Sequence, residues 1–439
     1  MLVQTTSKPQ NAATNRSPLV PAGMMAPFVL VTALFFLWGL PNNLNDVLIR
    51  QFMKSFQLTR FQAGLIQSAF YMGYFLLATP AALMMRRFGY KSGMIAGLCL
   101  LGTGTFLFWP AALVGQYWFF LLALFVIASG LSFLETASNP FIAQLGEPES
   151  AARRLNFSQA FNPIGAITGV LAGTLFIFSG VELTPAQVTS MKAAQTYSRY
   201  LRDETLRVVD PYLVIGALAF VLAILLWRCR FPAVAAESTV GPSGDSSFTD
   251  LVYYPHFLTA ICAQFMYVGA QVGTWSYFIQ YVQDYTHRPE KMAGYFLTGT
   301  LFAFGIGRFA SSALMGKISA ARLMGIYSLI NVGLLTTGVF LPGWVGLWTI
   351  FLSSFFMSVM YPTIFALGIE GLGENTKIAA SLIIMAIVGG AVLTPIMGLI
   401  SQRTGSIANA YAVPLAGYVF VAFYAFWGAG LRPLKRKHS

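Results

Sequence analysis

Three charged side chains fall inside long apolar segments of the sequence: Asp46, Glu135 and Arg308. A carboxylate or guanidinium at the centre of a bilayer costs at least about 2.5 kcal/mol on the most lenient insertion scale, so each residue needs an explanation. An apolar environment favours the neutral carboxylic acid over the carboxylate, and such an acid can bind and release a proton near neutral pH. Asp46 and Glu135 are therefore candidates for proton coupling.

Each of the three residues also has a structural interpretation. Asp46 could lie near the external membrane surface and end its helix beside Arg50. Glu135 could pair with a cation and hold two helices together. Arg308 could be the counter-charge of a carboxylate, or it could bond to backbone carbonyls at a helix break. The sequence leaves these two roles of Arg308 equally open.

Amide and aromatic side chains recur at helical spacing near these charges. Trp38, Asn42 and Asp46 share one helix face at i, i+4 spacing, with Asn43 about 100° away. Amides match the donors and acceptors of vicinal hydroxyls, and aromatic faces stack on a pyranose, so together they indicate a sugar site. For any single amide, an interhelical hydrogen bond is an equally good explanation. The predicted sugar-binding residues are Trp38, Asn42, Asn43, Gln67, Tyr71, Glu135, Asn139, Gln159, Asn162, Gln264, Tyr267, Gln271, Trp275 and Tyr361.

Membrane-spanning helices must hold these side chains. Of the 439 residues, 56% are apolar and 10% charged, and the mean hydropathy is +0.66. Soluble domains carry about 25% charged residues, so a soluble fold is excluded. Apolar runs of about 20 residues, long enough to cross a hydrocarbon core of about 30 Å, recur along the chain. We predict an all-α membrane protein with twelve transmembrane helices, near residues 26–48, 61–85, 92–113, 117–142, 156–179, 210–230, 255–284, 292–316, 321–341, 344–368, 377–401 and 409–431.

The chain divides into two similar halves of six predicted helices each, separated by a polar stretch at residues 233–250. Residues 140–146 resemble residues 362–368, and residues 165–173 resemble residues 390–398, in the same order within each half. This order favours an internal duplication. Two six-helix bundles around a site at the middle of the membrane would follow. The predicted domains are an N-terminal tail (1–24), a first bundle (25–230), a linker (231–252), a second bundle (253–431) and a basic tail (432–439).

The distribution of charge indicates how the chain is oriented. Sixteen of the 27 Lys and Arg residues lie on the side of the predicted chain termini, and under the positive-inside rule that side is cytoplasmic. The Lys and Arg residues that give the net charge of +12 lie in short gaps between apolar runs and form no continuous patch, so they indicate topology signals. We expect membrane lipid around the chain and no nucleic-acid partner. The three Cys and three His residues have no metal-binding or catalytic spacing, so we expect neither an enzyme nor a metal site.

The gap after the second predicted helix resembles a loop signature of the major facilitator superfamily, which runs Gly-x-Leu-x-Asp-Arg-x-Gly-Arg-Lys. Arg87, Gly89 and Lys91 match it, whereas Arg86 stands at the acidic position, so the salt bridge of that signature is in doubt here. We expect a structural or gating role for Arg87 and Gly89, and also for Arg308.

Longer runs resemble the bacterial L-fucose:proton symporter family of that superfamily. They are residues 36–46 (FLWGLPNNLND), 62–71 (QAGLIQSAFY), 134–140 (LETASNP), 267–271 (YVGAQ), 275–277 (WSY), 307–309 (GRF) and 361–365 (YPTIF). The resemblance implies a monomeric, multi-pass protein of the bacterial inner membrane, with both termini cytoplasmic, that imports a sugar with a proton and needs no other cofactor. It also implies that Asp46 and Glu135 couple the proton, with Asn43 and Asn162 near the sugar.

The substrate stays open at this point, because Pro163, Gly273, Thr274 and Met360 depart from the family pattern. L-fucose is the first expectation, and another hexose or an N-acetylhexosamine is the second. Sodium coupling, facilitated diffusion and a sugar sensor that does not transport are the alternatives. A multidrug exporter would be expected to show fewer amides in its cavity. We expect sugar and proton to bind in an outward-open cavity, and neutralisation of both acids to ease its closure.

Overall fold

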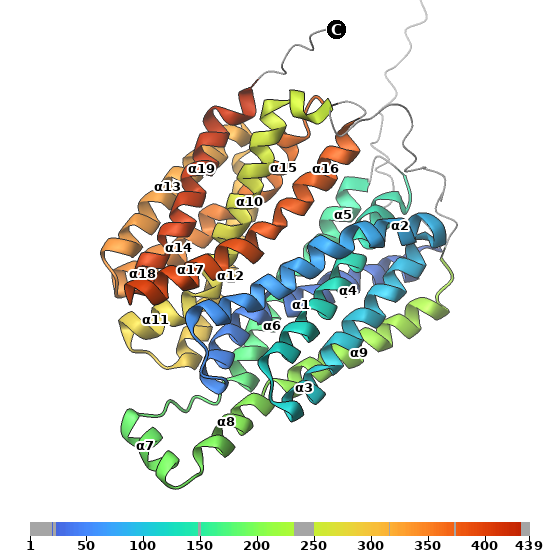
Figure 1. Cartoon of the computed structure of the whole chain (residues 1–439). Helices are drawn as coiled ribbons and strands as arrows, with labels where there is room; N and C mark the ends of the chain where they lie inside the picture. The colour runs from blue at the N-terminus through green and yellow to red at the C-terminus, as the bar shows by residue number, and fades with distance from the viewer. Residues whose placement is uncertain are drawn as a thin grey trace, which may run out of the picture.

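The computed structural model describes residue 20 and residues 23–147, 151–231, 250–315, 317–372 and 375–431. Most of the predicted N-terminal tail and linker, and the whole basic C-terminal tail, lie outside these residues. The described part of the chain is helical and contains no β-strand. Its helices form two groups that lie side by side (Figure 1).

The first group comes from the N-terminal half of the chain. Its helices are α1 (Met25–Ser55), α2 (Arg60–Phe106), α3 (Phe108–Val114), α4 (Tyr117–Gln144), α5 (Ala151–Gln159), α6 (Phe161–Ala172), the π-helical turn η2 (Gly173–Ile177), α7 (Pro185–Ala193), α8 (Tyr197–Leu206) and α9 (Val209–Arg228).

The second group comes from the C-terminal half. Its helices are η3 (Asp250–Tyr253), α10 (Pro255–Ser276), α11 (Phe278–Thr286), α12 (Glu290–Leu314), α13 (Ala320–Phe340), α14 (Trp344–Met357), α15 (Met360–Gly368), α16 (Thr376–Met385), η5 (Ala386–Val388), α17 (Gly389–Thr404), α18 (Ile407–Ala410), α19 (Ala412–Phe426) and η6 (Gly428–Gly430).

The predicted twelve-helix fold in two bundles is confirmed. Eleven helical stretches in the described part of the chain are long and apolar enough to cross a bilayer. The twelfth is α12, which has 25 residues and carries Arg308 inside an otherwise apolar sequence. Each bundle therefore contributes six membrane helices.

Several predicted helix boundaries were wrong. The first helix continues to Ser55 instead of ending at residue 48. The second and third helices meet without a loop, because Gly89 alone reverses the chain with a φ of 79°, a conformation that is open to glycine. The predicted loop at 180–209 contains α7 and α8, and Thr184 begins α7 with a capping box that includes Gln187.

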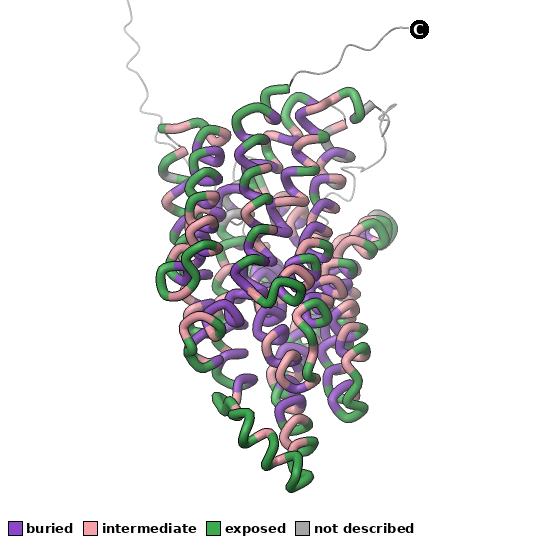
Figure 2. The backbone as a smooth tube through the Cα atoms, turned by 60° about the vertical axis from the view of Figure 1, so that its left-hand side comes forward, coloured by how far each residue is buried: buried purple, intermediate pink, exposed green. Residues whose placement is uncertain are grey.

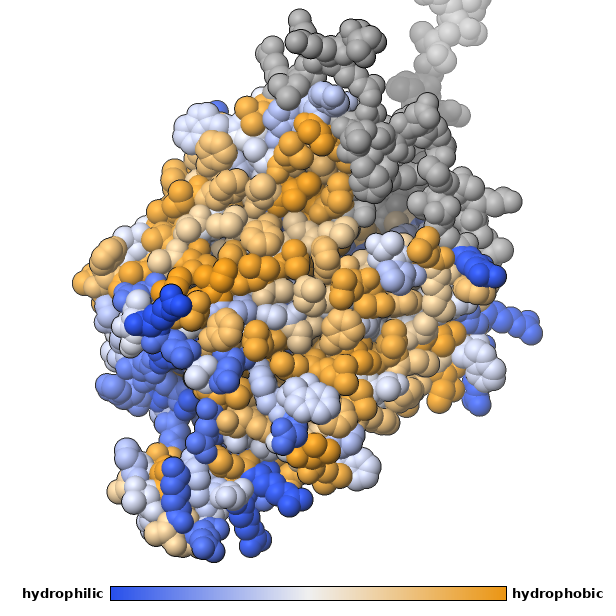
Figure 3. Space-filling model, in the orientation of Figure 1, coloured by the Kyte–Doolittle hydropathy of each residue, from blue (hydrophilic) through white to orange (hydrophobic). Residues whose placement is uncertain are grey.

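The surface of the molecule matches a membrane environment. Most of the outer face of the helices is hydrophobic, while hydrophilic residues gather around α7 and α8 (Figure 3). Large apolar side chains point outwards, such as Phe309 and Phe340, each 75% exposed. Buried residues run along the inner sides of the helices (Figure 2). We call the end of the molecule that carries α7 and α8 the α7–α8 end (Figure 1).

Glycines bring helices into close contact within each bundle. A Cβ at Gly165 or Gly169 of α6 would overlap the α1 backbone, and a Cβ at Gly389 of α17 would overlap the α10 backbone. These contacts make α6 and α17 equivalent partners of α1 and α10. The equivalence agrees with the repeat predicted between residues 165–173 and 390–398.

Candidate functional site

A cavity of about 270 Å³ lies between the two bundles. It lies near the lower limit of the size range typical of small-molecule sites. Eleven residues predicted for binding, coupling or gating line it: Asn42, Asn43, Asp46, Gln67, Tyr71, Glu135, Asn162, Gln271, Trp275, Arg308 and Tyr361. The structure therefore brings together side chains from both halves of the chain.

The remaining lining residues are mostly apolar. They are Tyr74, Pro163, Ala166, Val268, Val272, Leu301, Phe304 and Ile387. Tyr74 lies one turn after Tyr71, so helical spacing could have identified it as a binding residue. The apolar members carry no such signal, because most apolar residues of a membrane helix contact lipid or a neighbouring helix.

Asp46 lies at the contact between the bundles. Its Oδ1 atom accepts hydrogen bonds from Gln67 Nε2 and from Ser276 Oγ, both at 2.9 Å. Gln67 Nε2 also lies 2.9 Å from Ser276 Oγ, to which it donates. Asp46 is 3% exposed and is followed by nine further residues of α1. The interpretation that Asp46 ends its helix at the surface is therefore wrong.

Ser276 was not predicted as a site residue. It is the last residue of α10 and is fully buried. The sequence gives little reason to select it, because serine is tolerated in a membrane helix at little cost. Its position directly after Trp275, within a run that resembles a sugar transporter family, is the one available signal.

Glu135 differs from Asp46 in having a free carboxyl group. It makes no ion pair and no side-chain hydrogen bond with the described residues, so the predicted alternative of a structural ion pair is not observed among them. A second cavity of about 260 Å³ adjoins the first, and Tyr74, Glu135, Tyr361 and Ile387 line both. Glu135 therefore lies at the junction of the two cavities.

Asn139 and Gln159 belong to the second cavity or its surroundings. Asn139 lines the second cavity, donates to the backbone oxygen of Glu135 at 3.0 Å, and accepts from Gln159 Nε2 at 3.2 Å. Gln159 is exposed and does not line either cavity. The structure thus places Gln159 behind Asn139, as a support and not as a lining residue.

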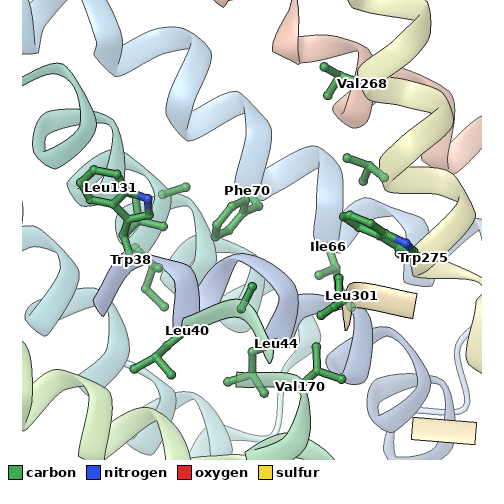
Figure 4. Close-up of a cluster of buried hydrophobic side chains, with 14 of the residues drawn as sticks. Trp38, Leu40, Leu44, Ile66, Phe70, Leu131, Val170, Val268, Trp275 and Leu301 are labelled. Carbon is green, nitrogen blue, oxygen red and sulfur yellow. The ribbon is translucent and has the colours of Figure 1, made fainter. Parts of the chain in front are cut away.

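Besides Gln159, three predicted binding residues lie outside both cavities. Trp38 is buried against Phe35, with ring centroids 4.3 Å apart. It lies on the opposite side of the apolar cluster from Trp275 (Figure 4). Tyr267 is fully buried and donates from its hydroxyl to the carbonyl of Met357 at 2.8 Å. Gln264 is also fully buried. The helical spacing of these three residues predicted a polar or aromatic face on α1 and on α10. Neighbouring side chains cover part of each face, so these residues do not reach a cavity.

Arg308 extends from α12 into the first cavity. Its guanidinium lies 5.1 Å from the ring centroid of Phe304, which is a cation–π distance. It forms no ion pair with the described residues. Of the two predicted roles, the counter-charge of a carboxylate is therefore not observed in this structure.

Arg87 and Gly89 lie far from the cavities, at the turn between the second and third membrane helices. The guanidinium of Arg87 lies 5.3 Å from the Phe88 ring, while Lys91 donates to the carbonyls of Trp227 and Cys229 at 2.9 Å. Lys91 thus attaches the start of the third membrane helix to the end of α9, within one bundle.

An ion cluster joins the bundles at the α7–α8 end. Lys54 Nζ of α1 lies 3.1 Å from Glu290 Oε1 of α12 and 3.2 Å from Glu204 Oε2 of α8. The exposed fractions of these side chains are 10%, 0% and 3% in that order, so water is largely excluded. Glu290 Oε1 also accepts from the backbone N–H of Gly180 at 3.1 Å.

A second set of contacts closes the same end. Arg60 pairs with Asp284 and donates to Ser401 Oγ at 2.7 Å, and Tyr277 donates to the carbonyl of Arg60 at 2.7 Å. Every hydrogen bond and ion pair between described residues of the two bundles lies at this end or between it and the first cavity. The structure is therefore closed at the α7–α8 end.

Comparison with known proteins identifies the family. The sequence model of the Major Facilitator Superfamily matches residues 28–386. The chain belongs to the major facilitator superfamily. Solved structures agree with this assignment: a superfamily transporter, FucP, in the outward conformation is 41% identical, with a TM-score of 0.69 over 92% of this chain and 99% of that one. The D-xylose-proton symporter is 12% identical with a TM-score of 0.70 and shows the shared fold alone.

Three relatives within the superfamily match nearly the whole chain. The L-fucose-proton symporter of Escherichia coli is 42% identical over 91% of this chain and 92% of its own length. The L-fucose-proton symporter of Haemophilus influenzae is 32% identical over 92% and 96%. The glucose/galactose transporter of Brucella abortus is 33% identical over 91% and 93%. All three are transporters and not enzymes.

Proposed function

We propose that this chain imports a sugar together with a proton by alternating access of its two bundles. The observation that carries the proposal is the first cavity, where amides and aromatic rings from both bundles meet two carboxyl groups of the first bundle. Amides and aromatic rings suit a sugar, and buried carboxyl groups suit a proton. The proton is the coupling ion, and no other cofactor is proposed.

L-fucose is the first candidate substrate. Two relatives that match this chain over nine-tenths of its length are L-fucose-proton symporters, and the E. coli protein is 42% identical. Another hexose is the second candidate, because glucose/galactose transporters match over a similar share of the chain. An N-acetylhexosamine would place an amide group against the same asparagine and glutamine side chains and is the third.

Asp46 and Glu135 are the proposed proton-coupling residues, and their proposed roles differ. Asp46 lies buried in the closed contact between the bundles, where a charge without water is costly. Glu135 lies with a free carboxyl group at the junction of the two cavities, where sugar and proton can both reach it. Protonation of both acids while the α7–α8 end is open lowers the cost of closing that end.

The proposed orientation follows from the charge distribution. With both termini in the cytoplasm of a bacterial inner membrane, the α7–α8 end faces outwards, and this structure is an inward-facing state. Residues 25–230 and 253–431 are the proposed rigid bundles, and the chain works as a monomer in lipid. FucP in its outward conformation is 41% identical to this chain but has a TM-score of 0.69, which supports a different placement of similar bundles.

The test uses de-energised cells that express the chain, in a lightly buffered suspension. Separate pulses of L-fucose, galactose, glucose and N-acetylglucosamine are added while external pH and uptake of the labelled sugar are recorded. An alkaline shift with one sugar identifies the substrate and supports proton symport. Uptake without a pH shift contradicts proton coupling and points to sodium coupling or facilitated diffusion; saturable binding without uptake indicates a sensor.

A further inference from the structure

The indole of Trp275 is held by side chains from two other helices. Its Nε1–H donates to Ser354 Oγ of α14 at 3.2 Å. Its ring is nearly perpendicular to the Phe304 ring of α12, at 82°, with the ring centroids 5.2 Å apart. Trp275 is 7% exposed, yet it lines the first cavity. A directional hydrogen bond and an aromatic contact together restrict how this ring can turn.

The backbone of α10 fixes the direction of this indole only in part. Trp275 is the last residue but one of α10, and the helix ends before Tyr277, where α11 follows. Staggered side-chain rotamers leave several directions open to a tryptophan ring. The contacts from α12 and α14 therefore select the direction that is observed.

Ser354 lies behind the wall of the cavity. It is fully buried and lines neither cavity, so its hydroxyl does not meet a sugar there. A serine oxygen has two lone pairs, and one of them accepts the indole N–H. A buried N–H without a partner is unfavourable. Without this acceptor, the indole would leave the observed orientation for one that pairs its N–H.

The orientation of the indole matters for a sugar in the first cavity. An aromatic ring binds a pyranose through stacking on its C–H face, and this contact has a preferred geometry. In the observed orientation, Trp275 lines the cavity beside Leu301 and Phe304. If the ring spent part of its time in another orientation, the apparent sugar affinity would fall by the fraction of time lost.

We propose that Ser354 is a positioning residue that holds the Trp275 indole in the orientation in which it stacks on the sugar. This inference rests on the proposed function, because it needs a sugar in the first cavity. Ser354 raises sugar affinity through Trp275. It takes no direct part in the movement of the bundles, since α10, α12 and α14 all belong to the second bundle.

The main test is Ser354→Ala in proteoliposomes, with uptake of labelled L-fucose, galactose, glucose and N-acetylglucosamine measured separately. For a sugar that the chain transports, KM should rise about three- to tenfold, as expected for loss of one hydrogen bond, while the maximal rate is kept. Ser354→Thr keeps the acceptor oxygen and should restore KM. Ser353→Ala is the matched control, because Ser353 is buried in the same helix and donates to the carbonyl of Ile350.

A double-mutant cycle shows whether the effect passes through the indole. Trp275→Phe keeps an aromatic ring but has no N–H. In that background, Ser354→Ala should cause no further loss of sugar affinity, measured by equilibrium binding. Tryptophan fluorescence gives a spectroscopic readout: the sugar-induced change that Trp275→Phe removes should be reduced in Ser354→Ala and kept in Ser353→Ala.

An unchanged KM in Ser354→Ala would overturn the proposal, and so would an equal loss of affinity in the two backgrounds. A lower maximal rate at unchanged KM would show a structural role and also overturn it. If Ser354→Ala does not fold, Ser354→Cys, whose sulfur is a weak acceptor, takes its place with the same outcomes. Failure of the proposed function is a separate result, because the unaltered chain would then take up none of the four sugars.

Discussion

At the scale of single residues, the two acids in the cavity differ in their surroundings. Asp46 accepts hydrogen bonds from both bundles, whereas the Glu135 carboxyl faces two cavities without a hydrogen-bond partner among the described side chains. Under the proposed mechanism, removal of a proton from Asp46 would change the contact between the bundles, while removal from Glu135 would change what the sugar meets. Substitutions at Asp46 and Glu135 should therefore have different effects on sugar accumulation and sugar affinity.

Asp46→Asn should abolish accumulation of sugar against a gradient. The amide keeps the Oδ1 acceptor for Ser276 and Gln67 but cannot release a proton, so exchange of sugar across the membrane should persist at near-normal rates. Accumulation and exchange are measured in the same vesicles with labelled sugar. The control is Asp203→Asn, at an exposed acid of α8. Full proton-driven accumulation by Asp46→Asn would refute the coupling role.

Glu135→Gln should reduce both accumulation and sugar affinity. The carboxyl group lies where cargo passes from one cavity to the other, so its replacement removes a proton carrier and alters a sugar contact. A fall in affinity of about tenfold, measured by equilibrium binding, corresponds to loss of a charge-assisted hydrogen bond. Unchanged affinity together with unchanged accumulation would remove Glu135 from the site.

The sequence alone identified the charged residues that lie inside membrane-spanning segments. A charge in an apolar run is costly, which is why Asp46, Glu135 and Arg308 were recognisable without a structure. Ser276 has no such cost and was missed. Trp38 does not line either cavity, because helical spacing specifies a face of α1 but not what fills it, and the Trp38 ring packs against Phe35.

At the scale of helices, glycines decide how closely the bundles approach. Gly398 of α17 faces α2, and a Cβ there would lie 2.5 Å from the carbonyl oxygen of Arg60 and also overlap the Tyr277 hydroxyl. The sequence indicated that this position belongs to a repeat but not that it lies between the bundles. The helix ends were also less predictable, because α7 and α8 are short and polar and resemble a loop in composition.

Gly398→Ala should hinder closure of the α7–α8 end and favour the open state. Spin labels on Lys192 of α7 and Arg403 of α17 would report a longer average distance, and net uptake should fall at least severalfold. Gly333→Ala is the matched control, since a Cβ at Gly333 of α13 meets nothing within 4 Å. Equal distances and equal uptake in the two variants would show that the contact at Gly398 relaxes without cost.

At the scale of the whole molecule, we expect the ion cluster at the α7–α8 end to influence the balance between the closed and open states of that end. Lys54 pairs with Glu290 across the bundles and with Glu204 inside its own bundle. When the bundles separate, Lys54 keeps Glu204, while Glu290 becomes hydrated. Opening therefore never leaves a buried lysine without a partner, which keeps its cost moderate.

Glu290→Gln should shift the population towards the state that is open at the α7–α8 end. Loss of the ion pair across the bundles is expected to change the ratio of states about tenfold or more, measured by the same spin-label distances. Glu204→Gln is the comparison, because its pair with Lys54 lies within one bundle and exists in both states. A larger shift for Glu204→Gln than for Glu290→Gln would contradict the assignment.

The wall shared by the two cavities also determines which compounds can pass. Glu135 stands where Tyr74, Tyr361 and Ile387 border both spaces. After its proton leaves, it presents a negative charge at that junction, and like charges brought together in a confined space repel strongly. We therefore expect sugar acids and sugar phosphates to pass this junction less readily than neutral sugars. A sugar that is phosphorylated after entry would be unable to return by the route it took.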